Sequence, residues 1–171
     1  MAVIRANYEL ARERAAALLD SQRITSPPVK VHEIAGFLGL NIKEARWPQP
    51  HSNEIQGYLN WGTKEIVLNA EDSFTRKRFT IAHEIGHVKL HEHDLENDPD
   101  LGIMFRQNMR EVNPDHRERE ANYFAACLLM PSNMVRRFYS VMGIADLATM
   151  FIVSESAMSY RIESLKKEGV I

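Results

Sequence analysis

Two histidines and a glutamate carry the clearest chemical signal in the sequence. His83 and His87 are four residues apart, and Glu84 directly follows the first histidine. On a helix, residues four apart lie on one face, about 5–6 Å apart at Cβ, so both imidazoles can reach one metal ion. Neutral imidazole suits zinc, and a glutamate beside the ligand pair can act as general base toward water at the metal. The pattern predicts one zinc ion per chain, with His83 and His87 as ligands and Glu84 as the catalytic residue.

A catalytic zinc site normally takes three protein ligands, so a third donor is needed. His91 would lie about 12 Å from His83 along a straight helix, which is too far for the same ion. His93 stands where one class of zinc proteases places a third histidine after a glycine turn. Leu90 occupies the glycine position here, so the required bend has no evident cause.

Two glutamates on a later predicted helix are the remaining candidates. Glu118 shares a helix face with Asn122, so the glutamate could bind metal while the asparagine orients a ligand histidine. Glu120 projects in a different direction. We favour Glu118 as third ligand, with Glu120 as the alternative. Both carboxylates could also simply begin an exposed helix turn, where negative charge suits the helix dipole.

Hydrophobic periodicity predicts the elements that must position these residues. Helices are expected over 4–20 and 31–38, the second ending at Gly39. Strands are expected over 40–45, 55–59 and 65–68, with a hairpin turn at 60–63. The metal helix begins after a cap at Asp72 or Ser73, and the acidic, turn-rich segment from His91 ends it. A long connection, a helix from about 113 to 130, a helix over 132–141 and a helix pair over 146–152 and 154–167 follow.

Composition and length indicate an ordinary globular chain. It has 171 residues, 44% of them hydrophobic and 26% charged, and its net charge of −2 carries no global signal for nucleic acid binding. We expect one α+β domain, with N-terminal helices at 1–39, a catalytic core at 40–130 and C-terminal helices at 131–171. The lone cysteine, Cys127, excludes an intrachain disulfide, and neither a signal peptide nor a membrane segment is evident, so a cytoplasmic location is expected. The basic turn from Arg76 to Arg78 is interpreted as a solvated face.

Two sequence blocks resemble the ImmA/IrrE family of zinc-dependent peptidases. The first runs from Arg78 to His87, and the second runs from Glu118 to Pro131. The resemblance implies a zincin-like fold, in which a small, mostly antiparallel sheet packs on the metal helix. It also implies that Glu118 is the third zinc ligand, and that the protein cleaves a helix-turn-helix repressor as an anti-repressor. Such proteins occur in mobile elements, stress responses and toxin–antitoxin modules.

The C-terminal helix pair also resembles that of the family and has the rhythm of a helix-turn-helix, although Ile152 stands where a turn glycine is usual. Four acidic and three basic side chains between Ile144 and Ile171 argue against a phosphate-gripping surface. The pair is therefore interpreted as a packing or substrate-docking unit rather than a DNA-binding one. An extended peptide is expected to add to a sheet edge near 65–68. The rival hypothesis is a non-proteolytic regulator with structural zinc.

Overall fold

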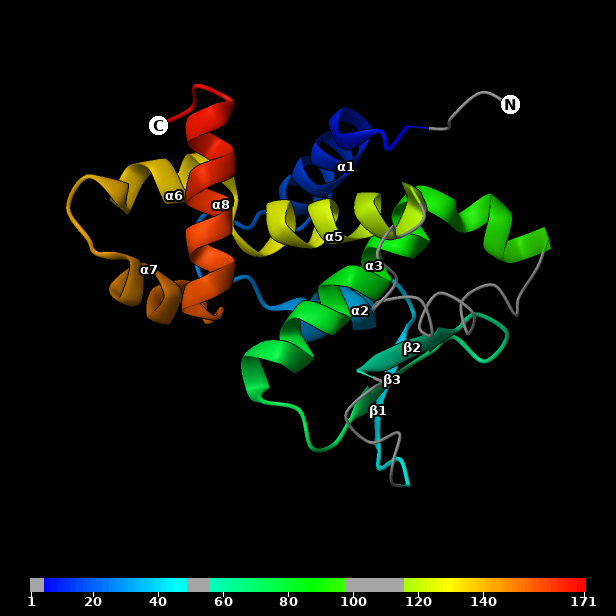
Figure 1. Cartoon of the computed structure of the whole chain (residues 1–171). Helices are drawn as coiled ribbons and strands as arrows, with labels where there is room; N and C mark the ends of the chain where they lie inside the picture. The colour runs from blue at the N-terminus through cyan, green and yellow to red at the C-terminus, as the bar shows by residue number, and fades with distance from the viewer. Residues whose placement is uncertain (1–4, 49–55, 98–115) are drawn as a thin grey trace.

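The computed structural model describes residues 5–48, 56–97 and 116–171. A three-stranded sheet lies at one end of the molecule and the C-terminal helices lie at the other, while two long helices, α3 and α5, run between them (Figure 1). The prediction of an α+β fold is confirmed. The described elements are α1 Tyr8–Ser21, α2 Val31–Phe37, β1 Asn41–Ala45, β2 Gly57–Asn60, β3 Glu65–Asn69, α3 Phe74–Asn97, α5 His116–Leu129, α6 Ser132–Tyr139, α7 Ile144–Phe151 and α8 Glu155–Lys167. The predicted connection between about 91 and 113 lies mostly outside the described residues.

The sheet has the strand order β1-β3-β2 and is mixed. β2 and β3 form the predicted antiparallel hairpin, in which Asn60 pairs with Glu65. β1 runs parallel to β3, so the expectation of a mostly antiparallel sheet holds for only one of the two strand pairs. β3 is the central strand, and the expectation of a free edge at 65–68 was therefore wrong. In the described part of the chain, β1 and β2 are the outer strands.

The short helix α2 ends as the sequence predicts. Gly39 has a φ of +72°, a left-handed conformation that glycine adopts without steric cost. The N–H of Leu40 donates to the carbonyl of Ala35 at 2.9 Å, and the N–H of Gly39 donates to the carbonyl of Gly36 at 3.0 Å. These two bonds satisfy the last carbonyls of the helix and direct the chain into β1.

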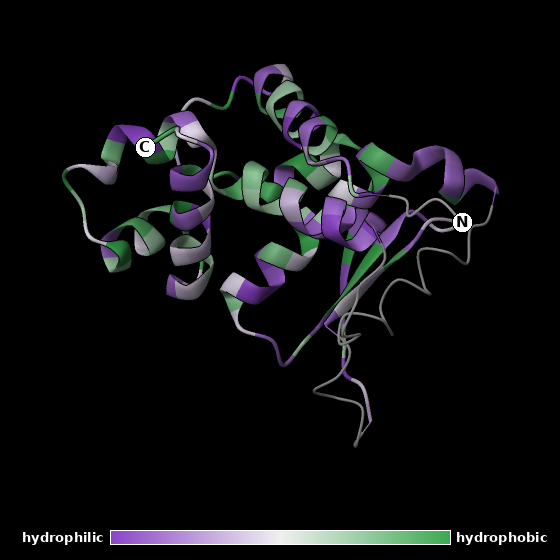
Figure 2. Cartoon of the chain, turned by 45° about the horizontal axis from the view of Figure 1, so that its top comes forward, coloured by the Kyte–Doolittle hydropathy of each residue, from purple (hydrophilic) through white to green (hydrophobic). Residues whose placement is uncertain are grey.

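The helix α3 begins at a serine cap and bends near its far end. The backbone N–H of Arg76 donates to the hydroxyl oxygen of Ser73 at 3.3 Å. His91 has non-helical dihedral angles, φ −129° and ψ 22°, and the helix continues beyond it to Asn97. The prediction that the helix ends at His91 was therefore wrong, because α3 extends to Asn97. The turns beyond the bend are hydrophilic (Figure 2), which is why the sequence pattern there does not resemble a buried helix.

The helices α3 and α5 cross at a very short distance at Gly86. A Cβ atom at this position would meet the Phe124 ring at 3.1 Å and the Ala121 backbone at 3.2 Å. Because glycine has no such atom, the two backbones can approach, and the N-terminal half of α5 packs directly over the centre of α3. Around the crossing lie the buried apolar residues of both helices, among them Ile81, Ala82, Ile85, Ala125 and Leu128.

Arg78 is buried, which corrects its interpretation as part of a solvated face. Its side chain is 4% exposed. Its Nη2 donates to the carbonyl of Val29 at 2.8 Å and its Nε to the carbonyl of Ile152 at 3.1 Å. Ile152 has a φ of +53°, a left-handed conformation that is strained for a β-branched residue. The arginine thus ties the metal helix to the strained turn between α7 and α8.

Among the described helices, none combines the length and the apolar character that a bilayer crossing requires.

Candidate metal centre

Three buried side chains from two helices converge at the centre of the molecule. The Nε2 atoms of His83 and His87 lie 3.0 Å apart on α3. From α5, Glu118 places Oε2 3.3 Å from Nε2 of His83 and Oε1 3.1 Å from Nε2 of His87. All three side chains are almost completely shielded from solvent. The structure therefore brings together the three residues that were named as candidate ligands.

The donor set and its spacing fit a zinc ion. In a tetrahedral site with bonds of about 2.0–2.1 Å, ligand atoms lie roughly 3.3 Å from one another. The two Nε2 atoms are 3.0 Å apart, and each lies 3.1 or 3.3 Å from a different oxygen of Glu118, distances close to that value. Neither carboxylate oxygen of Glu118 makes a hydrogen bond to the described residues, although both are buried. A buried carboxylate without hydrogen bonds is costly, and a bound cation would remove that cost.

The electrostatics of the cluster prepare two of these donors, Glu118 and His87, to bind a cation. Burial raises the pKa of Glu118, but its contacts with His83 and His87 outweigh burial and lower the pKa to about 2. Burial lowers the pKa of His87 to about 4, against the opposing effect of Glu118. At neutral pH the carboxylate is therefore ionised and the His87 imidazole is neutral, which are the protonation states that metal binding requires.

Asn122 contacts the His83 ring at Nδ1, the nitrogen that does not face the cluster. The side-chain oxygen of Asn122 lies 2.9 Å from Nδ1 of His83. If Nδ1 carries the proton and donates it to this oxygen, Nε2 keeps its lone pair and faces the cluster. Hydrogen bonds of this kind fix both the tautomer and the ring orientation of histidine ligands. The sequence argument paired Glu118 with Asn122 because they share a face of α5, and the structure places both against α3.

Glu84 lies next to His83 in sequence and is also buried, with 3% of its surface exposed. Burial lowers the pKa of His83, but Glu118, the charge of Glu84 and the Asn122 hydrogen bond outweigh burial and raise it. The charge of Glu84 thus acts on the cluster, while its carboxylate is not one of the three groups that converge there.

The alternative ligands lie elsewhere. Glu120 accepts the backbone N–H of Asn7 at 2.6 Å, and its other oxygen lies 3.4 Å from Nε2 of His91. Glu120 is thus directed toward the start of α1 and toward His91 at the bend of α3. The bend that His93 would need does exist, but His93 is exposed and contacts Asn97 on its own helix, with Nε2 3.2 Å from the Asn97 amide nitrogen.

Two features that position the cluster were missed from the sequence. Gly86 lies between the two histidines and permits the close crossing with α5, and a glycine inside the metal helix was the available signal. The other is the approach of His91, at the bend of α3, to Glu120 of α5, with 3.4 Å between Nε2 and Oε2. No sequence pattern indicated it, because the two residues are far apart in the chain.

Comparison with known proteins identifies the family. Residues 38–163 match the family described as Peptidase_M78, IrrE N-terminal-like domain. The chain belongs to this family. The resemblance seen in the two sequence blocks is therefore confirmed.

A solved structure titled "Mycobacterium tuberculosis transcriptional regulator" shares the fold. Its TM-score is 0.63 at 17% sequence identity, and the match covers 91% of this chain. This chain spans about half of that protein, 47% of its length. No curated protein sequence matches the chain. The likeness at this identity concerns the fold, and it adds no information on the chemistry of the site.

Proposed function

We propose that this member of the IrrE N-terminal-like family is a zinc-dependent endopeptidase of the cytoplasm. The observation that carries the proposal is the convergence of His83, His87 and Glu118 within hydrogen-bond distances of one another, with Glu84 buried beside them. Membership in a peptidase family supports the same reaction class. A purely structural zinc site is closed by four protein ligands, whereas three protein donors leave a position open for chemistry.

Each residue has a separate role in the proposed reaction. His83, His87 and Glu118 hold the ion, and Asn122 keeps the His83 ring in the binding orientation. Zinc in this site would supply Lewis acidity, which lowers the pKa of water and polarises a carbonyl. Glu84 accepts the proton from the water that attacks the scissile carbonyl and returns it to the leaving amine nitrogen.

The proposed substrate is a helix-turn-helix transcriptional repressor, so that cleavage relieves repression. Membership in the IrrE N-terminal-like family supports this substrate class, and the transcriptional regulator with the same fold is compatible with it. With β3 in the centre of the sheet, β2 is the outer strand of the hairpin and the candidate for pairing with an extended substrate segment.

The C-terminal helix pair is proposed to position the core and to dock substrate rather than to bind DNA. One face of α8 is buried in the molecule through Met158, Arg161, Ile162 and Leu165. Its connection to α7 is tied to the metal helix by Arg78. The charge balance of the helix pair gives it no strong attraction for phosphate.

The experiment that tests this function compares the wild-type protein with Glu84→Gln. Glutamine keeps the size of the side chain but removes the basicity needed for proton transfer. Zinc content and melting temperature should stay unchanged, while cleavage should fall by about 10²–10⁴-fold. Two substrates are needed, a candidate helix-turn-helix repressor and a peptide library made by digesting a bacterial lysate.

The two substrates separate the parts of the proposal. Cleavage of the library but not of the repressor would retain the peptidase and reject the substrate. A folded, zinc-loaded Glu84→Gln protein that cleaves at the wild-type rate would remove Glu84 from the mechanism. If the wild type cleaves nothing but relieves repression, and Glu84→Gln relieves it equally well, the non-proteolytic regulator is the correct function.

A further inference from the structure

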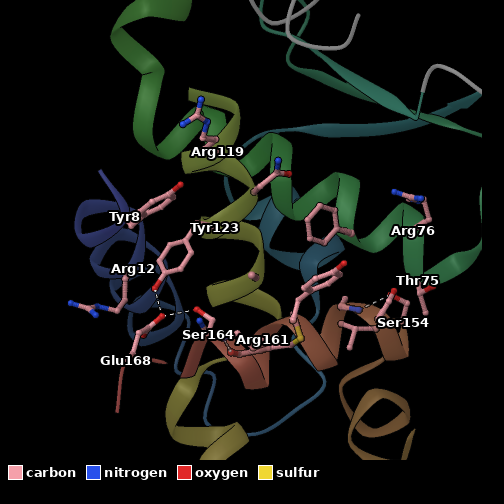
Figure 3. A pocket seen from close by; sticks show the side chains of 18 of the residues that line it. Tyr8, Arg12, Thr75, Arg76, Arg119, Tyr123, Ser154, Arg161, Ser164 and Glu168 are labelled. Atoms are coloured by element: carbon pink, nitrogen blue, oxygen red, sulfur yellow. Dashed lines mark hydrogen bonds between the residues drawn. The ribbon is translucent and has the colours of Figure 1, made fainter. Parts of the chain in front are cut away.

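A cavity lies between α1, α5, α8 and the start of α3. Its volume is about 1150 Å³, which is enough for a small organic molecule. Tyr8, Tyr123 and Arg161 are among the side chains that line it (Figure 3). None of the candidate metal ligands, nor Glu84, lines this cavity. It is therefore separate from the space in which a peptide bond would be cleaved.

The wall of this cavity contains a buried charge with an unused donor. Arg161 is only 4% exposed, and its Nε donates to the carbonyl of Met130 at 3.0 Å. Its Nη1 has no hydrogen-bond partner among the described residues. A guanidinium group cannot lose its proton at physiological pH, and buried donors are almost always satisfied. An acceptor is therefore expected beside Nη1, in this cavity or in a smaller one of about 260 Å³ that Arg161 also borders.

Part of the wall is apolar or aromatic. The Tyr8 and Tyr123 rings lie with their centroids 5.0 Å apart, and the Arg161 guanidinium lies 6.0 Å from the centre of the Tyr123 ring. Phe79, Met130 and Val153 line the same space. At the rim, Tyr160 on α8 is 72% exposed. A ligand with a hydrophobic body would bury apolar surface against these side chains.

The charges that line the cavity favour an anion at Arg161. Arg12, Arg76 and Arg119 also line the cavity, whereas its acidic residues are Glu9 and Glu168. Glu168 already accepts hydrogen bonds from Tyr123 at 2.9 Å and from Ser164 at 2.7 Å. These bonds partly satisfy its charge, and they hold it two helix turns away from Arg161 along α8.

We propose that this cavity binds a small organic anion, with an aromatic or aliphatic body and a single carboxylate or phosphate held by Nη1 of Arg161. The size of the cavity and the buried position of the guanidinium favour a small molecule over a macromolecule. The oxygens of a carboxylate and of a phosphate both accept charge-assisted hydrogen bonds from arginine, so both kinds of anion are tested.

The site has one direct connection to the metal centre, which is Asn122. This residue lines the cavity and holds Nδ1 of His83 at 2.9 Å. A ligand in the cavity therefore lies against the residue that orients a candidate metal ligand. The binding proposal itself does not depend on the peptidase function, because the cavity and Arg161 exist independently of any ion.

Isothermal titration of the full chain, freed of metal with a chelator, tests the proposal. The probes are 3-phenylpropionate, phenyl phosphate and the neutral 3-phenylpropan-1-ol. We expect at least one anion to bind at a single site with a dissociation constant of about 1 mM or tighter. The alcohol should bind at least about tenfold more weakly, because it cannot form a charge-assisted bond to arginine. Which of the two anions binds more tightly distinguishes a carboxylate from a phosphate ligand.

Substitutions then locate the site. Arg161→Met should weaken binding of the preferred anion by about tenfold or more, whereas Arg14→Met, at an exposed arginine of α1 outside the cavity, should not. Arg161→Met also loses the bond to Met130, so Ala157→Phe, which fills the cavity from α8, serves as a second variant. Melting curves verify that each variant is folded.

Three results would overturn the proposal. The first is that neither anion binds to the wild type, which means that water alone satisfies Arg161. The second is that the alcohol binds as tightly as the anions. The third is that a folded Ala157→Phe protein binds the preferred anion with wild-type affinity. Because every titration is done without metal, none of these results affects the proposed peptidase function.

Discussion

Glu118 and Glu120 lie two residues apart on α5, and both are buried against histidines of α3, but their surroundings differ. Glu118 faces two imidazole nitrogens at 3.1 and 3.3 Å and makes no hydrogen bond to the described residues. Glu120 accepts a backbone N–H at 2.6 Å and faces a single imidazole at 3.4 Å. The first carboxylate is thus arranged for a cation, and the second is arranged for the protein's own N–H group.

The two carboxylates differ in the number and kind of donors that face them rather than in burial. Both glutamates are less than 10% exposed. A backbone N–H fixes the position of Glu120 and links α1 to α5, whereas Glu118 is held only by its own helix and by its contacts with the histidines. Substitutions that separate metal binding from folding test this difference between Glu118 and Glu120.

The largest effect is expected for Glu118→Ala. Loss of a direct ligand should weaken zinc binding by more than the 10–100-fold loss that is typical of an outer hydrogen-bond partner. Competition with a chelator of known affinity measures the change. Glu120→Ala is the matched control, since it removes a buried carboxylate from the same helix and should leave zinc affinity close to that of the wild type. The opposite order would make Glu120 the ligand.

Asn122→Ala should have the next largest effect. Without the bond to Nδ1, the His83 ring loses its fixed tautomer and orientation, and zinc affinity should fall by about 10–100-fold. Asn97→Ala is the control, because it removes another asparagine that contacts a histidine, the exposed His93. If Asn97→Ala lowers zinc affinity and Asn122→Ala does not, His93 returns as a candidate ligand.

Glu120→Ala should act on stability rather than on metal. It removes the charged acceptor of the Asn7 N–H, a partly buried hydrogen bond, which should lower the free energy of unfolding by about 1–3 kcal/mol. The melting temperature should fall by about 2–4 °C for each kcal/mol. Glu13→Ala, at an exposed glutamate of α1, should change little. Equal stability of the two variants would show that the Glu120 contacts contribute nothing measurable to folding.

Gly86→Ala is expected to have the smallest effect, and its sign is informative. Alanine is normally preferred over glycine inside a helix, but here its Cβ would lie 3.1–3.2 Å from Phe124 and Ala121. Pushing α5 away should destabilise the fold by about 1 kcal/mol or more and move Glu118 from the histidines. Gly36→Ala in α2, where a Cβ meets nothing within 4 Å, should instead stabilise by about 0.4–1 kcal/mol. Chemical denaturation measures the change in stability of both variants. Changes of the same sign would contradict the argument that α3 and α5 cross closely at Gly86.

Much of the local structure could be predicted because it depends on neighbouring residues. The Gly39 stop, the hairpin between β2 and β3 and the serine cap of α3 all follow from turn and capping chemistry that acts over a few residues. The parallel pairing of β1 with β3 could not be predicted in this way. It joins strands distant in sequence, and their pairing depends on the packing of α2 and α3 rather than on a turn.

The burial of Arg78 was misjudged from the sequence, and Arg161 is buried in a similar way. A charged side chain in a basic stretch reads as solvent-exposed, since charged residues are rarely buried without partners. Both arginines are buried because backbone carbonyls from distant segments reach them, from Val29 and Ile152 for one and from Met130 for the other. The positions of those carbonyls depend on how the helices pack, and no local pattern encodes them.

The sequence by itself determined the chemistry that the site can offer. Two imidazoles four residues apart and an adjacent glutamate share one short helix, and helical geometry alone brings the histidines together. Only the tertiary structure decided which distant carboxylate meets them. The physical reason is the crossing of α3 and α5 at Gly86, where the absence of one Cβ lets the backbones approach and directs Glu118, rather than Glu120, toward the histidines.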